Sequence, residues 1–293
     1  MTATATTTTG PATTPPTTRT AEAARHSDRA LADWWRSTIV FAGRNLQHIR
    51  QIPEKLLDVT IQPLMFVLLF AYVFGGAIAV QGGNYREFLI GGILIQSLAF
   101  AMMGPATAIA TDQQEGVIDR FRSLPVPRSS YLSGHFLAEL GGIGMSIVIL
   151  LGTGLLVGWR THNDFLHVAG GLVLLVLFAA AIVWIGTLIG LLVRSPDAVM
   201  GIGFTIVFPL TFISNAFVPI DSMPSVLQTI AEWNPISALV AAVRDLFGND
   251  VGQVVPHSWP LQHAVLFAFL SCAIMLILAV PATLHRYRVR TTD

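Results

Sequence analysis

The sequence predicts an all-α integral membrane protein with six transmembrane helices. Of its 293 residues, 53% are hydrophobic and only 12% are charged, whereas soluble domains carry about 25% charged residues. Six apolar runs are each close to the roughly 20 residues that a helix needs to cross a bilayer. They lie at 61–80, 88–111, 134–157, 166–193, 199–219 and 261–284. The composition and the run lengths together predict that most of the chain lies in lipid.

The N-terminal region divides into a tail and an amphipathic segment. Residues 1–30 are rich in Thr, Ala and Pro, so they predict a disordered tail that precedes a membrane domain at 31–293. Between 31 and 52, apolar residues recur every three or four positions and arginines fill the other side. This pattern predicts a helix lying in the membrane interface, and a helix packed on protein is the alternative. Pro53 ends or kinks it.

The stretch 225–247, just before the last apolar run, is too polar to span. It contains Glu232, the pair Asn234-Pro235 and Arg244. We expect a re-entrant hairpin of two short helices that dips into the outer leaflet or lies on it. Non-helical backbone at such a depth is tolerated only where protein or water satisfies it.

The distribution of basic residues predicts the topology. With the N-terminus in the cytoplasm, 14 of the 17 basic residues fall in inside segments, and only Arg86, Arg160 and Arg244 fall outside. Positive charge concentrates on the cytoplasmic side of membrane proteins. Both termini are therefore predicted to be cytoplasmic, as an even number of spans requires.

The longest predicted cytoplasmic loop, 112–130, has the character of a docking segment. Its first half predicts a short helix with apolar residues on one side and charges on the other, and Pro125 and Pro127 end it. Charges at the edge of this helix would orient a soluble partner, and the apolar residues would bind in a groove of that partner. The alternative is a solvated loop that carries the inside positive charge.

Two groups of residues carry a family resemblance. Glu115-Gly116, then Arg120, then Leu124-Pro-Val-Pro-Arg128 resembles the signature of ABC-2 type exporter permeases, although Val117 and Pro127 stand where that family commonly has Thr and Ser. The second group is similar to the family's segment before its last span. It consists of Phe217-Val-Pro-Ile-Asp-Ser-Met-Pro224, Asn234-Pro235 and Ala242-Val-Arg244. The resemblance covers about 30–290 and is strongest to the daunorubicin/doxorubicin-resistance permease branch.

The resemblance implies the membrane half of an ATP-driven efflux pump for hydrophobic drug-like or natural-product-like molecules in the bacterial plasma membrane. Two permease copies, expected to be identical, would pair with cytosolic ABC ATPase subunits that hold ATP and Mg. The chain itself is expected to bind no cofactor, because its one lysine, Lys55, is not in a P-loop sequence. The residues expected to couple it to the ATPase are Glu115, Gly116, Asp119, Arg120, Phe121, Arg122, Pro125 and Arg128.

Two helical stripes are candidates for the substrate pathway, which the resemblance places between the second and fifth spans. One is Gln96, Phe100 and Met103; the other is Phe204, Phe208 and Phe212 with Asn215 nearby. Aromatic rings stack on flat molecules, and methionine adapts to several shapes. Helix packing or lipid contact is the alternative for each residue.

Three further features complete the prediction. Glu139 lies about a turn inside the third span, where a carboxylate is a functional candidate by default; pairing with His135 or a loop arginine is the favoured alternative. Gly141 and Gly144 are expected to allow close helix packing. The spacing of the histidines predicts no metal site.

Other function classes fit the sequence less well. An ion-coupled secondary transporter usually has charged groups or broken helices near the midplane, and the spans carry almost no charge apart from Glu139. A membrane enzyme needs a nucleophile or metal cluster, and none is evident. The zero net charge gives no reason to expect nucleic-acid binding. Within the exporter class, lipid or polysaccharide remains an alternative cargo.

Overall fold

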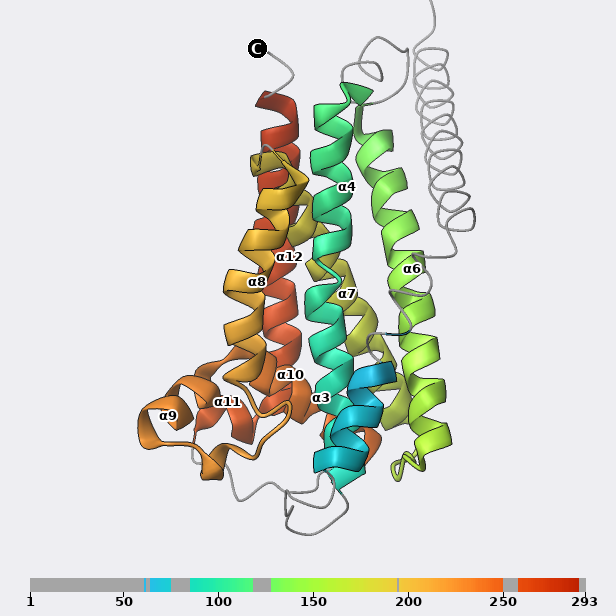
Figure 1. The fold of residues 1–293 in the computed structure, drawn as a ribbon, viewed down its shortest axis with the longest axis vertical. Helices are drawn as coiled ribbons and strands as arrows, with labels where there is room; N and C mark the ends of the chain where they lie inside the picture. The colour runs from blue at the N-terminus through green and yellow to red at the C-terminus, as the bar shows by residue number, and fades with distance from the viewer. Residues whose placement is uncertain are drawn as a thin grey trace, which may run out of the picture.

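The structure, a computed structural model, describes residues 61, 64–74, 85–117, 128–193, 195–249 and 258–289. Every element in these ranges is helical, and the long helices run side by side along one axis (Figure 1). They are α3 (Tyr85–Phe100), α4 (Met103–Gln114), α6 (Arg128–Val157), α7 (Phe165–Leu192), α8 (Pro196–Phe212) and α12 (Ala264–Val289). The predicted all-α architecture is confirmed for the described part of the chain.

Shorter helices gather at one end of the bundle. They are η1 (Leu69–Phe74), η2 (Ile220–Ser222), α9 (Ser225–Trp233), α10 (Pro235–Phe247) and α11 (Trp259–Gln262). We call this the hairpin end, and the opposite end, where α12 finishes, the C-terminal end (Figure 1). The predicted pair of short helices is present as α9 and α10, which are bent by 70° at Asn234.

Four described segments are long and apolar enough to cross a membrane, and a fifth is added if α9 and α10 count as one span. They are Tyr85–Gln114, Tyr131–Val157, Phe165–Leu192 and Ala264–Tyr287, close to the second, third, fourth and sixth predicted runs. The first run is described only at 61 and 64–74, and the interfacial helix predicted at 31–52 lies outside the described residues.

The fifth predicted run, 199–219, is only partly helical. Helix α8 ends at Phe212 after 17 residues, so the prediction that this run continues as a helix to 219 was wrong. Pro209 lies inside the helix near its end, and the residues beyond Phe212 bond to the α9–α10 hairpin. The chain therefore leaves the helix early, because other groups satisfy its backbone.

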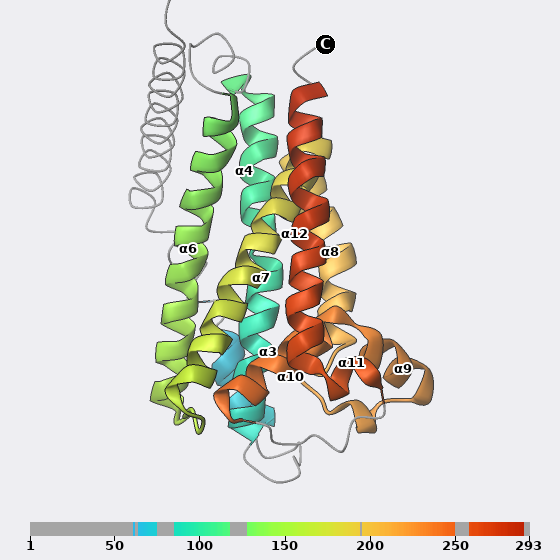
Figure 2. The ribbon, with the colours of Figure 1, turned by 180° about the vertical axis from the view of Figure 1, so that it is seen from behind.

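Helix α7 is the packing centre of the bundle. It contacts α4, α6, α10 and α12, and Figure 2 shows it crossing diagonally in front of α3 and α4. Gly186 and Gly190 bring α7 close to α4, because an added Cβ at either would lie 2.5 Å from a backbone oxygen of that region. Gly141 and Gly144 do not show the expected close packing among the described residues, since an added Cβ there meets none of their atoms within 4 Å.

The second predicted span is interrupted between α3 and α4. Pro105 has no amide hydrogen, so the carbonyl of Ala101 accepts instead from Gly104, three residues on, at 3.2 Å. The two halves still form one apolar segment of 30 residues. The break leaves the middle of this span locally irregular beside α6 and α8.

Candidate functional site

The predicted coupling segment is described only at its two flanks. Glu115 is exposed, and Gly116 ends α4 with a φ of +67°, a left-handed conformation that glycine adopts without strain. The structure therefore gives a backbone reason for the glycine of this motif. Arg128 opens α6, but its side chain lies outside the described residues. So do the other predicted coupling residues, which are Asp119, Arg120, Phe121, Arg122 and Pro125.

A hydrogen bond joins the two flanks of this segment at the C-terminal end. The Tyr131 hydroxyl of α6 donates to a carboxylate oxygen of Asp112 in the last turn of α4, at 2.5 Å. The Tyr131 ring is buried and stacks on Tyr287 of α12 and on His135, with centroids 6.3 and 6.5 Å away.

The same turn of α4 is also tied to α7. Gln113 donates through Nε2 to the carbonyl of Gly190 at 2.6 Å. Ile109, one turn earlier, is fully buried against Tyr131, Leu132 and Leu191. Four helices, α4, α6, α7 and α12, thus meet directly beside the start of the coupling segment. Reasoning from the sequence missed this junction, although Asp112 and Gln113 lie within the loop it singled out.

The two predicted pathway stripes do meet in the structure. The rings of Phe100 on α3 and Phe204 on α8 have centroids 6.0 Å apart. Met103 lies against Gly203, where an added Cβ would be 2.3 Å from the methionine Cε. The stripe on α3 and α4 is largely shielded from solvent: Gln96 is only 5% exposed, and Phe100 and Met103 are half-buried.

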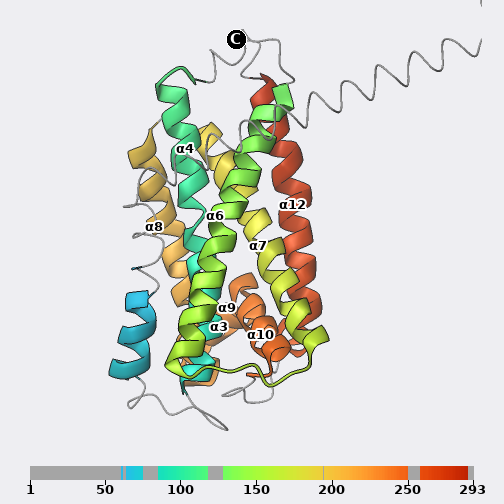
Figure 3. The same ribbon diagram turned by 90° about the vertical axis from the view of Figure 1, so that its right-hand side faces the viewer.

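The α8 stripe forms an open aromatic face. Phe204, Phe208 and Phe212 are 52%, 45% and 39% exposed, and the last two rings stack at 4.2 Å. Ring contacts lead from this face into the protein at the buried Phe217, whose centroid lies 5.2 Å from that of Phe212 and 4.7 Å from that of Phe70 in η1. Figure 3 shows α8 and η1 along the same edge of the bundle. Asn215, predicted beside this stripe, is instead buried at 5% exposure.

The predicted intramembrane acid lies beside the break in the second span. Glu139 is half-buried on α6, and its Oε2 would lie 3.5 Å from a Cβ placed on Gly104. His135, one turn before it, is buried at 4% exposure. In the described part of the chain no group of three or more His, Cys, Asp or Glu residues is arranged to hold a metal ion.

At the hairpin end, Asn234 completes the broken end of α8. Its Nδ2 donates to the carbonyls of Leu210 and Ile213, both at 2.7 Å, and its Oδ1 accepts from the amide of Ile236. Carbonyls in the last turn of a helix have no partner within the helix. One side chain therefore caps both α8 and α10.

Arg244 of α10 extends this network to α3. It is 1% exposed, its Nε donates to the carbonyl of Phe88 at 2.8 Å, and one Nη donates to the carbonyl of Ala216 at 3.1 Å. The guanidinium carbon lies 3.5 Å from the centre of the Phe88 ring, a cation–π geometry. The topology prediction placed Arg244 on the outer side of the membrane, which the structure does not test; the structure adds that Arg244 is buried as a donor between three segments.

Two adjacent glycines of α3 make room for these contacts. A Cβ on Gly91 would lie 3.0 Å from the Arg244 stem, and a Cβ on Gly92 would lie 1.9 Å from the oxygen of Ala216. Nearby, the hydroxyl of Tyr85 donates to the carbonyl of Phe217 at 3.2 Å. The Gly-Gly pair was the sequence signal for this close approach.

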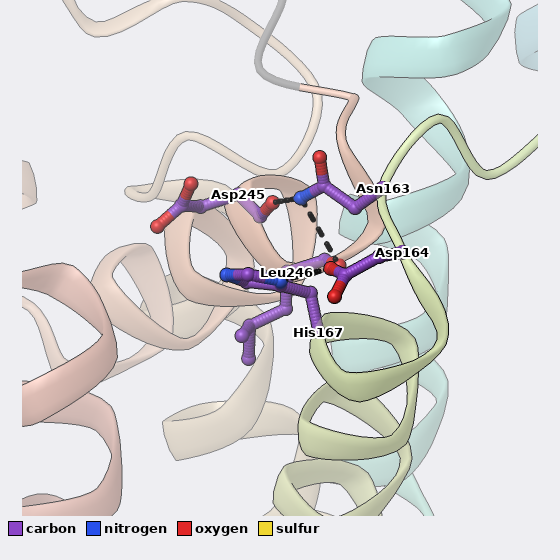
Figure 4. A network of polar contacts seen from close by, with 5 residues as sticks. All are labelled: Asn163, Asp164, His167, Asp245 and Leu246. Atoms are coloured by element: carbon purple, nitrogen blue, oxygen red, sulfur yellow. Dashed lines mark hydrogen bonds and ion pairs between the residues drawn. The ribbon is translucent and has the colours of Figure 1, made fainter.

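The loop between α6 and α7 holds the other side of α10. Asn163 donates through Nδ2 to the carbonyls of Asp245 and Leu246, at 2.7 and 3.4 Å (Figure 4). Gly248 ends α10 with a φ of +72° and lies against Asn163. Asn249, 1% exposed, donates to the carbonyl of Arg160 at 2.8 Å. The hairpin is therefore bonded from both sides.

An exposed pair begins α7 beside this loop. The Asp164 carboxylate is hydrogen-bonded to His167, as Figure 4 shows. This bond holds the pKa of Asp164 below its ordinary value. Both side chains face solvent, so the pair is a minor feature of the surface.

Comparison with known proteins gives the family. Residues 36–247 match the ABC-2 type transporter family. A daunorubicin resistance ABC transporter permease protein of Streptomyces coeruleorubidus is 32% identical over 216 residues, which are 74% of this chain and 76% of that protein. A doxorubicin resistance ABC transporter permease protein of Mycobacterium tuberculosis is 25% identical over 76% of this chain and 79% of its own length. A putative transport permease of Cyanophora paradoxa is 26% identical over 72% and 74%. The chain belongs to the ABC-2 type transporter family.

Proposed function

We propose that this ABC exporter permease moves flat, hydrophobic drug-like or natural-product-like molecules out of a bacterial cell. Membership of the family makes the chain a multi-pass transport subunit that works with an ATPase and is not itself one. The named resistance functions of two relatives, to daunorubicin and doxorubicin, support the cargo. Lipid or polysaccharide is the competing cargo.

The observation that carries the cargo proposal is the open aromatic row on α8. Phe204, Phe208 and Phe212 are exposed, whereas Gly203, Val207 and Thr211 on the other side of α8 are buried. Aromatic rings stack in offset geometry on planar ligands. In this proposal the row, with Phe100 and Met103 beside it, lines the pathway, and Gln96 and Asn215 lie behind it.

The assembly we propose has two copies of this chain and two copies of a separate cytosolic ATPase that holds ATP and Mg. Each permease would have six spans, with both termini in the cytoplasm and the domain at 31–293 in the plasma membrane. The C-terminal end of the bundle then faces the cytoplasm, and the hairpin end lies in the outer leaflet. The segment from Glu115 to Arg128 would dock on the ATPase, and Glu139 would lie in the cytoplasmic half.

Inverted membrane vesicles test this function directly. The tagged chain is expressed together with the ABC ATPase that co-purifies with it, and ATP-dependent uptake of doxorubicin is followed by quenching of its fluorescence. Wild-type vesicles should accumulate the drug and Phe208→Ala vesicles should lose most of the uptake, because the row loses its central ring. Phe165→Ala is the matched control, since Phe165 is an exposed phenylalanine at the start of α7. Equal uptake by all three proteins would overturn the pathway, and ion-driven uptake without an ATPase would overturn the exporter.

A further inference from the structure

We propose that the Asp112–Tyr131 hydrogen bond is a positioning link that carries movement of the coupling segment into the helix bundle. The proposal rests on the proposed function, because it takes the segment after Glu115 to be where the ATPase docks. It adds two residues that neither the motif nor the predicted coupling set contains.

The geometry gives this bond a particular place. Asp112 lies in the last turn of α4, and Tyr131 lies in the first turn of α6, so the bond closes the chain on itself around the segment between them. A displacement of that segment is then delivered to α4 and α6 together. Without the bond, the two flanks are joined only by the apolar packing of Ile109 with Tyr131 and Leu132, which is less directional than a hydrogen bond.

Tyr131 is also a contact point for helices outside the loop. Its ring is 4% exposed, and it stacks on Tyr287 near the end of α12. Gln113, next to Asp112, bonds to the backbone of α7. A movement received at Asp112 and Tyr131 can therefore reach α7 and α12 through packed side chains and hydrogen bonds, the kinds of contact that carry coupling between distant sites.

The bond is suited to this task because it is local and direct. It joins two side chains at 2.5 Å and involves no backbone group, so its loss leaves the helices themselves intact. Burial of the Tyr131 ring fixes the hydroxyl in place at little further cost in side-chain entropy. A hydroxyl in this position has a positional role, and the folding core does not depend on it.

The test compares transport with ATP hydrolysis in proteoliposomes that contain the tagged chain and the ATPase that co-purifies with it. The variants are Tyr131→Phe, Asp112→Asn and the double variant, and each is first checked for ATPase binding and for its melting temperature. Tyr85→Phe is the matched control, because it removes a tyrosine hydroxyl bond at the hairpin end of the same bundle.

We expect both single variants to bind the ATPase and to melt only slightly below the wild type, as the loss of one hydrogen bond implies. Doxorubicin moved per ATP hydrolysed should fall at least about twofold in each, within the range by which residues on a coupling route change coupling. The double variant should fall no further than the singles, because all three proteins lack the same bond. Tyr85→Phe should keep the wild-type ratio.

Two results overturn the inference alone. One is a wild-type ratio in Tyr131→Phe and Asp112→Asn, and the other is an equal fall in Tyr85→Phe, which would mean that any lost hydroxyl bond has this effect. Failure of the wild-type chain to bind any ATPase overturns the proposed function itself, and the inference with it.

Discussion

The two ends of the bundle use polar side chains in different ways. At the hairpin end, Asn234 and Arg244 donate to backbone carbonyls of the broken α8 and of α3. At the C-terminal end, Tyr131 bonds to another side chain, Asp112, between two intact helices. A backbone carbonyl that loses its donor in an apolar surrounding lowers the stability of the fold. When a hydrogen bond between two side chains is removed, the backbone hydrogen bonds of both helices remain. We therefore expect the hairpin end to determine stability and the C-terminal end to determine coupling.

The largest expected effect is at Arg244. Arg244→Met keeps much of the apolar stem but removes both donors, so it should lower the free energy of unfolding by about 3 kcal/mol or more. Thermal melting of the detergent-purified chain measures this loss. Arg160→Ala is the control, because Arg160 is exposed at the same end and its side chain donates to the carbonyls of Leu155 and Trp159, which are close to it in the chain. Equal melting of the two variants would remove Arg244 from the stability argument.

A smaller loss is expected from crowding the same contact. Gly92→Ala places a Cβ where the oxygen of Ala216 now lies, so the segment after α8 must shift, at a cost of about 1–3 kcal/mol. Gly144→Ala on α6 meets no neighbour within 4 Å and should be neutral or slightly stabilising, because alanine favours helix. Melting of the pair separates crowding from helix propensity, and a Gly92→Ala protein as stable as Gly144→Ala would contradict the close approach.

At the C-terminal end the stability effect should be weaker. Gln113→Leu removes one hydrogen bond to the backbone of α7, which is worth about 1 kcal/mol. The Gly190 carbonyl keeps its place in α7, so no large rearrangement follows. A loss in melting temperature as large as that of Arg244→Met would show that the two ends do not differ as described.

The smallest effect is expected at the exposed Asp164–His167 pair. The hydrogen bond from His167 lowers the pKa of Asp164, so any stability it adds is present above the ordinary aspartate pKa and is lost as pH falls through the lowered value. Asp164→Asn should therefore melt marginally below the wild type at pH 7, and the two should converge in acid. A difference that grew on acidification would contradict the sign. Solvent-facing pairs add little.

Much of the architecture could be predicted from the sequence because the bilayer imposes simple lengths. Four of the six predicted runs correspond to long apolar helices, and the pair of short helices at 225–247 is present. The sequence identified Asn234 and Arg244 as motif residues, but it did not predict that both donate hydrogen bonds to backbone carbonyls of other segments. Sequence periodicity gives a residue's face on its own helix, and these two act on the backbone of other segments.

The candidate pathway shows the same division. Helical spacing predicted that Phe204, Phe208 and Phe212 share one face, and the structure leaves that face open. The same reasoning treated Asn215 as part of it, yet α8 ends three residues earlier and the chain turns inward. Tyr131 gave no signal, because a tyrosine at the start of an apolar helix is ordinary until its partner is known.

By itself the sequence determined the membrane class, the approximate spans and the family motifs, since hydrophobic length, charge distribution and short motifs are local properties of the chain. The tertiary structure decided where α8 stops, which glycines bring helices together, and that the Arg244 side chain is buried. Each of these depends on a contact between segments far apart in the chain, such as Phe88 with Arg244. The free energy of such a contact depends on the distance between the two groups in space, which no local pattern encodes.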